Sequence, residues 1–164
     1  MIKEFFLFLL FGLIFLALQS TWFAPDFLDP LRLDMVFVLV IFLGTLTRIG
    51  RGLSLSILLG LFVDVLSWGM PGAAMILYPL FFWIFYFLAS HTDIHSLGFV
   101  IIAVLVFQIF YGFGIHFFLA LFKGLEFNRN QVLLIFEQAV LTMLTGLPVL
   151  FLFKRLFHKK PSLM

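Results

Sequence analysis

Long apolar stretches follow one another along almost the whole chain, and only short polar segments separate them. A helix needs about 20 apolar residues to cross the hydrocarbon core of a bilayer. Of the 164 residues, 64% are hydrophobic and only 11% are charged, whereas about 25% of the residues in a soluble domain are charged. Only lipid can keep so many apolar side chains away from water. The sequence therefore predicts one all-α integral membrane domain over residues 1–164.

Prolines, glycines and polar residues divide the chain into six candidate transmembrane helices. Asp29 is the expected N-cap of the second helix, with Pro30 at its first position, where the missing N–H costs nothing. Pro79 is expected to kink the fourth helix. The expected helices cover residues 2–24, 30–47, 52–68, 71–90, 96–122 and 131–153.

Basic residues are distributed unequally between the two ends of these helices. The side of a membrane protein that carries more Lys and Arg is usually cytoplasmic. The richer side has Lys3, Arg48, Arg51, Lys154, Arg155, Lys159 and Lys160, and the other has Arg32, Lys123 and Arg129. We therefore expect both termini in the cytoplasm.

Two further features of the composition restrict the function. The chain has no cysteine, which excludes disulfides, thiol catalysis and zinc sites built from cysteine. It also has no run of five or more basic residues, so we expect no nucleic-acid partner.

The third expected helix carries a stripe of small and polar residues. They recur every four residues, which places them on one helix face, and small residues at this spacing allow close helix contact in lipid. We expect this face to pack against protein, and Leu59 beside it to face lipid. A carboxylate inside a membrane must also be paired or wetted, so we expect the last residue of the stripe to be buried near the outer surface. The stripe consists of Gly52, Ser56, Gly60 and Asp64.

Two other helices carry similar stripes, so we expect the three faces to meet. The fifth has Gln108, Gly112, His116 and Ala120, and the sixth has Gln138, Thr142 and Gly146, with Glu137 beside them. Asp64, His116 and Glu137 then fall at similar depths and form an outward polar cluster. Two carboxylates and a histidine are suitable metal ligands, but their spacing matches no ligand motif. The cluster is therefore interpreted as a hydrogen-bonded structural centre or a partner-binding pocket, with metal binding or catalysis as the alternative.

Two cytoplasmic turns carry charged residues. His91, Asp93 and His95 lie between the fourth and fifth helices, where alternate residues of this kind can bind metal, although a solvated turn needs no special geometry. Arg48 and Arg51 lie in a tight turn before the third helix. They set topology and contact anionic lipid, or they anchor a cytoplasmic partner. No phosphate-binding loop or hydrolase motif is present, and we expect neither an enzyme nor a cofactor.

Several segments resemble the family of the rod shape-determining protein MreD. That family has a glycine-rich third helix with a "GLxxD" segment and a small-residue turn, and a "PD" pair followed by aliphatic residues at the start of its second helix. Asp34 stands in the position of that pair's aspartate, but Leu33 replaces its proline. The matching residues are Arg51-Gly52, Gly60-Leu61-Phe62-Val63-Asp64-Val65-Leu66-Ser67, Gly69-Met70-Pro71-Gly72 and Asp34-Met35-Val36-Phe37-Val38-Leu39-Val40.

The resemblance implies a function without catalysis. It implies a subunit of the bacterial elongation complex in the cytoplasmic membrane, with MreC as partner, RodA and its penicillin-binding transpeptidase nearby, and MreB coupled indirectly. Such a subunit helps to direct lateral peptidoglycan synthesis and to maintain rod shape. Asp34, Gly52, Ser56, Gly60, Asp64, Gly69 and Gly72 are then the candidates for helix packing and for the partner interface.

Two alternatives remain. The six-helix arrangement of the family is also similar to the substrate-binding subunits of energy-coupling-factor vitamin transporters, in which the outward cluster would be a ligand pocket. The sequence offers few convergent polar groups and few outer-loop residues for a vitamin. A membrane enzyme acting on lipid would use Asp64 and Glu137 as acid and base.

Overall fold

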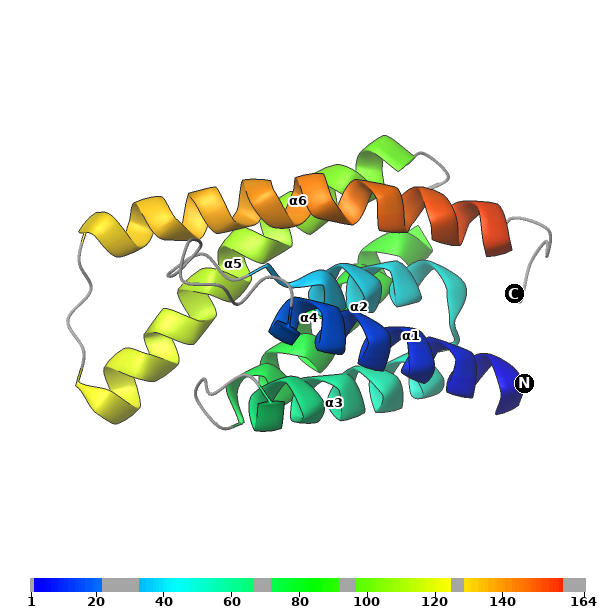
Figure 1. Cartoon of the computed structure of the whole chain (residues 1–164), viewed down its shortest axis with the longest axis horizontal. Coiled ribbons are helices and arrows are strands. Elements are labelled where there is room, and N and C mark those ends of the chain that lie inside the picture. Colours follow the sequence, from blue (N-terminus) through cyan, green and yellow to red (C-terminus); the bar gives the residue numbers. More distant parts are fainter. Residues whose placement is uncertain (1, 22–32, 67–71, 92–96, 125–128, 158–164) are drawn as a thin grey trace.

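The computed structural model describes residues 2–21, 33–66, 72–91, 97–124 and 129–157 (Figure 1). These residues form six α-helices and no β-strand, as the sequence predicts. The helices are α1 (Ile2–Thr21), α2 (Met35–Leu46), α3 (Ile49–Leu66), α4 (Ala73–His91), α5 (Leu97–Lys123) and α6 (Arg129–Phe157).

Four of the helices are long and apolar enough to cross a membrane: α3, α4, α5 and α6. In α5 and α6 the apolar windows are Gly98–Phe122 and Asn130–Leu152. These lengths agree with a multi-pass membrane protein. The start of α1, the α2–α3 turn and the end of α6 lie at one end of the bundle, and the end of α5 and the start of α6 lie at the other (Figure 1).

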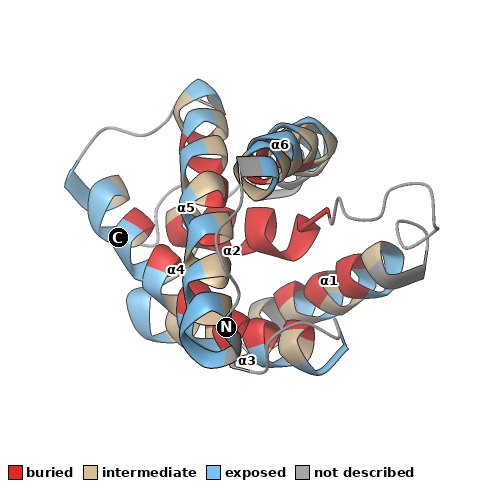
Figure 2. Ribbon diagram, turned by 90° about the vertical axis from the view of Figure 1, so that its left-hand side faces the viewer, coloured by how far each residue is buried: buried red, intermediate tan, exposed pale blue. Residues whose placement is uncertain are grey.

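Helix α2 is the centre of the bundle. All residues from Met35 to Gly44 are buried, and the other helices surround it (Figure 2). A helix that is apolar all round belongs inside a protein or a membrane. It has only 12 residues, a length of about 18 Å at 1.5 Å per residue. This length is well short of the roughly 30 Å of the hydrocarbon core.

The expected start of the second helix is wrong. The helix begins at Met35 with Asp34 as its N-cap, and not at Pro30; Asp29 and Pro30 lie outside the described residues. In Figure 1, α2 begins partway along the bundle and runs toward the end that holds the α2–α3 turn. The start of α2 is therefore a buried polar site, whereas a helix that crosses the whole membrane would begin at the surface.

The glycine stripe of α3 packs against α4. A Cβ atom on Gly60 would lie 2.6 Å from the carbonyl oxygen of Ala74 and 2.8 Å from the Cα of Met75. A Cβ on Gly52 would overlap the ring of Phe82. The helix backbones approach closely where the glycines lie, as the spacing predicts.

One expectation about the same helix is wrong. Leu59 does not face lipid, because it is buried and occupies the space beside Gly12 of α1. Helix α3 thus has two protein-facing sides, toward α4 and toward α1 and α2. Leu61 and Val65, which are 40% and 70% exposed, lie on its outer side.

Aromatic rings fill the space around α2. Phe37 of α2 packs against Tyr78 of α4 and Tyr111 of α5, with ring centroids 5.7 and 5.0 Å apart. Phe81 packs against the same Phe37 ring at 5.7 Å and against Phe107 at 5.7 Å. Ring pairs at these distances contribute favourable contacts beyond simple burial. Phenylalanine in this chain therefore builds the interior as well as the outer surface.

Candidate functional site

The most unusual polar group in the interior is the carboxylate of Asp34. The residue is only 6% exposed and stands directly before α2. Its Oδ1 accepts a hydrogen bond from the backbone N–H of Phe37 at 2.9 Å. Both of its oxygens lie 2.7 Å from the donating hydroxyl of Tyr78. The ring of Tyr111 packs against that of Tyr78, with centroids 5.5 Å apart.

The position of Asp34 explains why a strong acceptor is needed there. The first N–H groups of any helix have no partner inside the helix. At a helix end inside a membrane, water cannot satisfy them, so the protein itself must supply the acceptors. Aspartate is among the best N-cap residues, and its negative charge is stabilised by the positive end of the helix dipole. Asp34 therefore allows α2 to begin in the interior.

Two more helices contribute acceptors at the same place. The backbone N–H of Asp34 donates to Oγ1 of Thr142 in α6 at 3.4 Å. The N–H of Met35 donates to Oε1 of Gln19 in α1 at 3.2 Å. Helices α1, α2, α4, α5 and α6 thus meet at one polar centre, which we call the Asp34 hub and define as Asp34 with Gln19, Tyr78, Tyr111 and Thr142.

Asp64 performs a similar task for a different helix. Its Oδ1 accepts from the N–H of Ala74 at 3.0 Å, and its Oδ2 accepts from the N–H of Met75 at 2.9 Å. The carboxylate at the end of α3 therefore caps the first turn of α4. The sequence predicts a hydrogen-bonded Asp64, and backbone N–H groups at the start of the fourth helix are its donors.

The expected outward cluster of Asp64, His116 and Glu137 is not formed. Helix α3 contacts neither α5 nor α6 among the described residues, and no three potential metal ligands there lie together. Glu137 is exposed on α6, and His116 lies half-buried on α5 beside Phe113 and Phe117. Similar stripes do not guarantee mutual contact, because each small residue packs against whichever helix is nearest.

The three stripes have separate partners. A Cβ on Gly112 of α5 would lie 2.8 Å from Ile135 of α6, so this pair does meet as expected. A Cβ on Gly146 of α6 would instead lie 2.9 Å from Val38 of α2. The expectation that the third helix joins α5 and α6 is wrong, because the central α2 separates them.

The remaining expected residues are placed as follows. Ser56 is buried and donates to the carbonyl of Leu53 at 2.8 Å. Gly72 has φ +89 at the start of α4, a conformation that favours glycine. Arg48 is exposed, and its carbonyl accepts from the N–H of Arg51 in the tight α2–α3 turn. His91 is exposed at the end of α4. Gly69, Asp93 and His95 lie outside the described residues.

Sequence reasoning missed the tyrosines of the Asp34 hub. The chain has 26 phenylalanines and only three tyrosines. Where Phe is the usual aromatic residue, a Tyr marks a position at which a hydroxyl has a use. Tyr78 and Tyr111 are 0% and 4% exposed; Tyr78 donates to Asp34, and the Tyr111 ring packs against it. The rarity of tyrosine was the signal that could have located the hub.

The chemistry of the Asp34 hub is that of an acceptor with its donors. The backbone N–H of Phe37 and the hydroxyl of Tyr78 donate to the carboxylate oxygens of Asp34. Such an arrangement fixes helices relative to one another.

A comparison of this chain with family models, with curated proteins and with solved structures finds no match.

Proposed function

We propose that this chain is a non-catalytic subunit of the bacterial elongation complex. In this proposal it lies in the cytoplasmic membrane with six spans and both termini inside. It binds MreC, lies near RodA and its penicillin-binding transpeptidase, and is coupled indirectly to MreB. It thereby helps to direct lateral peptidoglycan synthesis and to maintain rod shape. Membrane lipids cover the rest of its apolar surface.

One observation supports a scaffold in particular. The two aspartates in the segments that resemble the MreD family are Asp34 and Asp64, and both bind the backbone at the start of a helix. Residues used in this way hold helices in place and are not available to a substrate. Carboxylates that cap helices therefore favour a scaffold, which presents surfaces to partner proteins.

The vitamin-binding alternative has less support. The polar groups that converge in the interior, around Asp34, are bonded to one another. The hollows beside Phe136 and beside Phe113 are apolar and open to the outside. A vitamin site needs an enclosed pocket with several unoccupied polar groups.

The proposal is tested by purification of the tagged chain from native membranes in a mild detergent, with identification of the proteins that accompany it. The proposal predicts enrichment of MreC and of the elongation synthases. Depletion of the chain should also turn rod-shaped cells round. Enrichment of a transporter ATPase module instead, with normal cell shape on depletion, would contradict the proposal and favour the vitamin-binding alternative.

A further inference from the structure

Two carboxylates from different helices hold the same short segment of α4. Asp64, at the end of α3, accepts hydrogen bonds from the N–H groups of Ala74 at 3.0 Å and Met75 at 2.9 Å. Tyr78 follows Ala74 by four residues and donates to Asp34 at 2.7 Å. Residues four apart share a helix face and lie about 6 Å apart along the axis. Asp64 and Asp34 therefore bind adjacent turns of residues 73–78, which we call the entry segment of α4.

The backbone of the entry segment is also in close contact with α3. A Cβ atom on Gly60 would lie 2.6 Å from the carbonyl oxygen of Ala74 and 2.8 Å from the Cα of Met75. Gly60 and Asp64 are one turn apart on the same side of α3. The last turns of α3 thus hold Ala74 and Met75 by steric contact and by hydrogen bonds, so a displacement of this end of α3 moves both residues.

Pro79 weakens the link between the entry segment and the rest of α4. It lies inside the helix, directly after Tyr78. Proline has no N–H, and its ring crowds the carbonyl of the residue four positions earlier. In α4 that carbonyl belongs to Met75, whose own N–H is bound by Asp64. The position of the entry segment therefore depends strongly on its contacts with α3 and α2.

We propose that the entry segment couples α3 to the Asp34 hub, and that Asp64 is the positioning residue that keeps the Tyr78 hydroxyl on Asp34. Coupling of this kind needs a connected element whose position both sites influence, and the entry segment is bonded at both of its ends. At the hub, the start of α2 is bonded in turn to Gln19 of α1 and Thr142 of α6. This coupling is a property of the fold and does not depend on which complex contains the chain.

Hydrogen–deuterium exchange of the purified chain in detergent, followed amide by amide by NMR, tests the coupling. We expect Asp64→Leu to raise the exchange rates of Ala74 and Met75 about tenfold, because their acceptor is lost. The deciding amide is that of Phe37, which is bonded to Asp34 and which should exchange about threefold faster in the same variant. An unchanged rate at Phe37 would overturn the coupling.

Two buried residues beyond Pro79 distinguish coupling from general loosening. Phe82 and Phe85 are both 0% exposed on α4, and their amides should change less than about twofold in Asp64→Leu. A rise there equal to the rise at Phe37 would contradict the proposal. Asp64→Asn keeps one acceptor and should give smaller changes in the same order, which decides the question if the leucine variant does not fold.

The reverse experiment follows from the reciprocity of coupling. Tyr78→Phe should raise the exchange rates of Ala74 and Met75, although Tyr78 does not bond either amide through its hydroxyl. Pro79→Ala restores a donor for the carbonyl of Met75 and ties the entry segment to the rest of α4. In that background we expect Asp64→Leu to have little effect on Phe37, and an undiminished effect would contradict the role assigned to Pro79.

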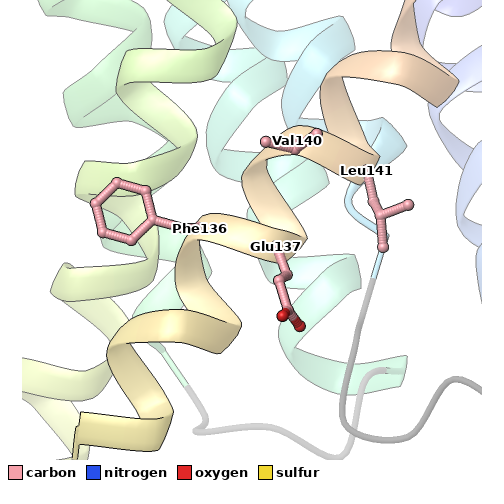
Figure 3. A pocket seen from close by; sticks show the side chains of 4 residues that line it. All are labelled: Phe136, Glu137, Val140 and Leu141. Carbon is pink, nitrogen blue, oxygen red and sulfur yellow. The ribbon is translucent and has the colours of Figure 1, made fainter.

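The controls lie on the other side of the bundle. Val140→Ala changes the outward side of α6, where Val140 lies near Phe136 (Figure 3) and is 47% exposed, and it should leave all these rates unchanged. Gly112→Ala places a Cβ 2.8 Å from Ile135 and disturbs the contact between α5 and α6 instead. A rise at Ala74 in Gly112→Ala as large as that in Asp64→Leu would overturn the proposal, because the entry segment would then respond to any loss of stability.

Discussion

The hydroxyl of Tyr78 in α4 lies 2.7 Å from both carboxylate oxygens of Asp34, the residue that starts α2. This contact joins α4 to the start of α2 through two residues that are 44 positions apart in the sequence. It also places a carboxylate at the start of a helix of only 12 residues that begins inside the bundle. The stability of the bundle should therefore depend on a small number of hydroxyl and carboxylate groups.

The first prediction concerns the Tyr78 hydroxyl. Tyr78→Phe keeps the ring contact with Phe37 but removes a donor from a buried carboxylate. A loss of about 1–3 kcal/mol in the free energy of unfolding is expected for a buried acceptor that loses its donor. Unfolding in a graded series of mixed micelles, followed by circular dichroism, measures this loss.

The control for that measurement is Tyr86→Phe. Tyr86 is half-buried, stacks on Phe82 and does not contact Asp34. We expect this change to leave stability within about 0.5 kcal/mol, as for substitutions away from special features. Equal effects of the two substitutions would mean that the Tyr78 hydroxyl does not bind Asp34.

The second prediction concerns the contact between α3 and α4. Gly60→Ala places a Cβ against the backbone of Ala74, which cannot move independently of its helix. Overpacking of this kind costs typically 1–3 kcal/mol, and Gly60→Leu should abolish folding. The matched control is Val65→Leu on the exposed side of α3, which should be neutral. Thermal unfolding of purified variants measures both, and a neutral Gly60→Leu would refute close α3–α4 packing.

The third prediction separates capping from chemistry at Asp64. Asp64→Asn keeps one oxygen that can accept from Ala74 or Met75, whereas Asp64→Leu keeps none. Loss of a cap costs about 0.5–2 kcal/mol, so the leucine variant should lose the cell-shape function proposed for this chain, and the asparagine variant should retain much of it. Complementation of a depletion strain measures the difference. Equal loss of function in two variants that both remain folded would instead indicate a catalytic or metal-binding role.

The fourth prediction concerns topology. The chain has no cysteine, so single cysteines report their own accessibility. We expect a membrane-impermeant thiol reagent added to intact spheroplasts to label Asn130→Cys, at the exposed start of α6, and to leave Arg48→Cys unlabelled until the cells are opened. The reverse pattern of labelling would place the termini outside and contradict the proposed orientation.

Periodicity and composition predicted the helical class and the approximate position of every helix. They also predicted the close contact at Gly60 and the hydrogen-bonded state of Asp64. These features depend on local spacing, which a sequence displays directly. The start of α2 was misplaced because Asp29 and Pro30 form a good start signal by local rules. Asp34 instead accepts a hydrogen bond from Tyr78, 44 positions away, and donates its backbone N–H to Thr142, 108 positions away.

The expected cluster of Asp64, His116 and Glu137 failed for a related reason. The depth of a residue along its helix can be counted from the sequence. The rotation of each helix about its own axis, and the order in which the helices lie beside one another, depend on how all the helices pack. The position of α2 between α3 and α6 decides that order, and no local pattern records it. Glu137 consequently lies on the outside of the bundle.

The central claim is that Asp34 acts as an acceptor that holds helices together, and its most direct test compares two substitutions. Asp34→Asn keeps an oxygen for the N–H of Phe37 and the Tyr78 hydroxyl, and asparagine is an equally good N-cap. Asp34→Ala removes both acceptors, which should cost about 2–4 kcal/mol from the lost cap and the unsatisfied hydroxyl together. We predict that complementation of a depletion strain is nearly normal with the asparagine variant and absent with the alanine variant. A folded, stable Asp34→Asn protein that fails to restore cell shape would contradict the account, because the ionisable group itself would then be required.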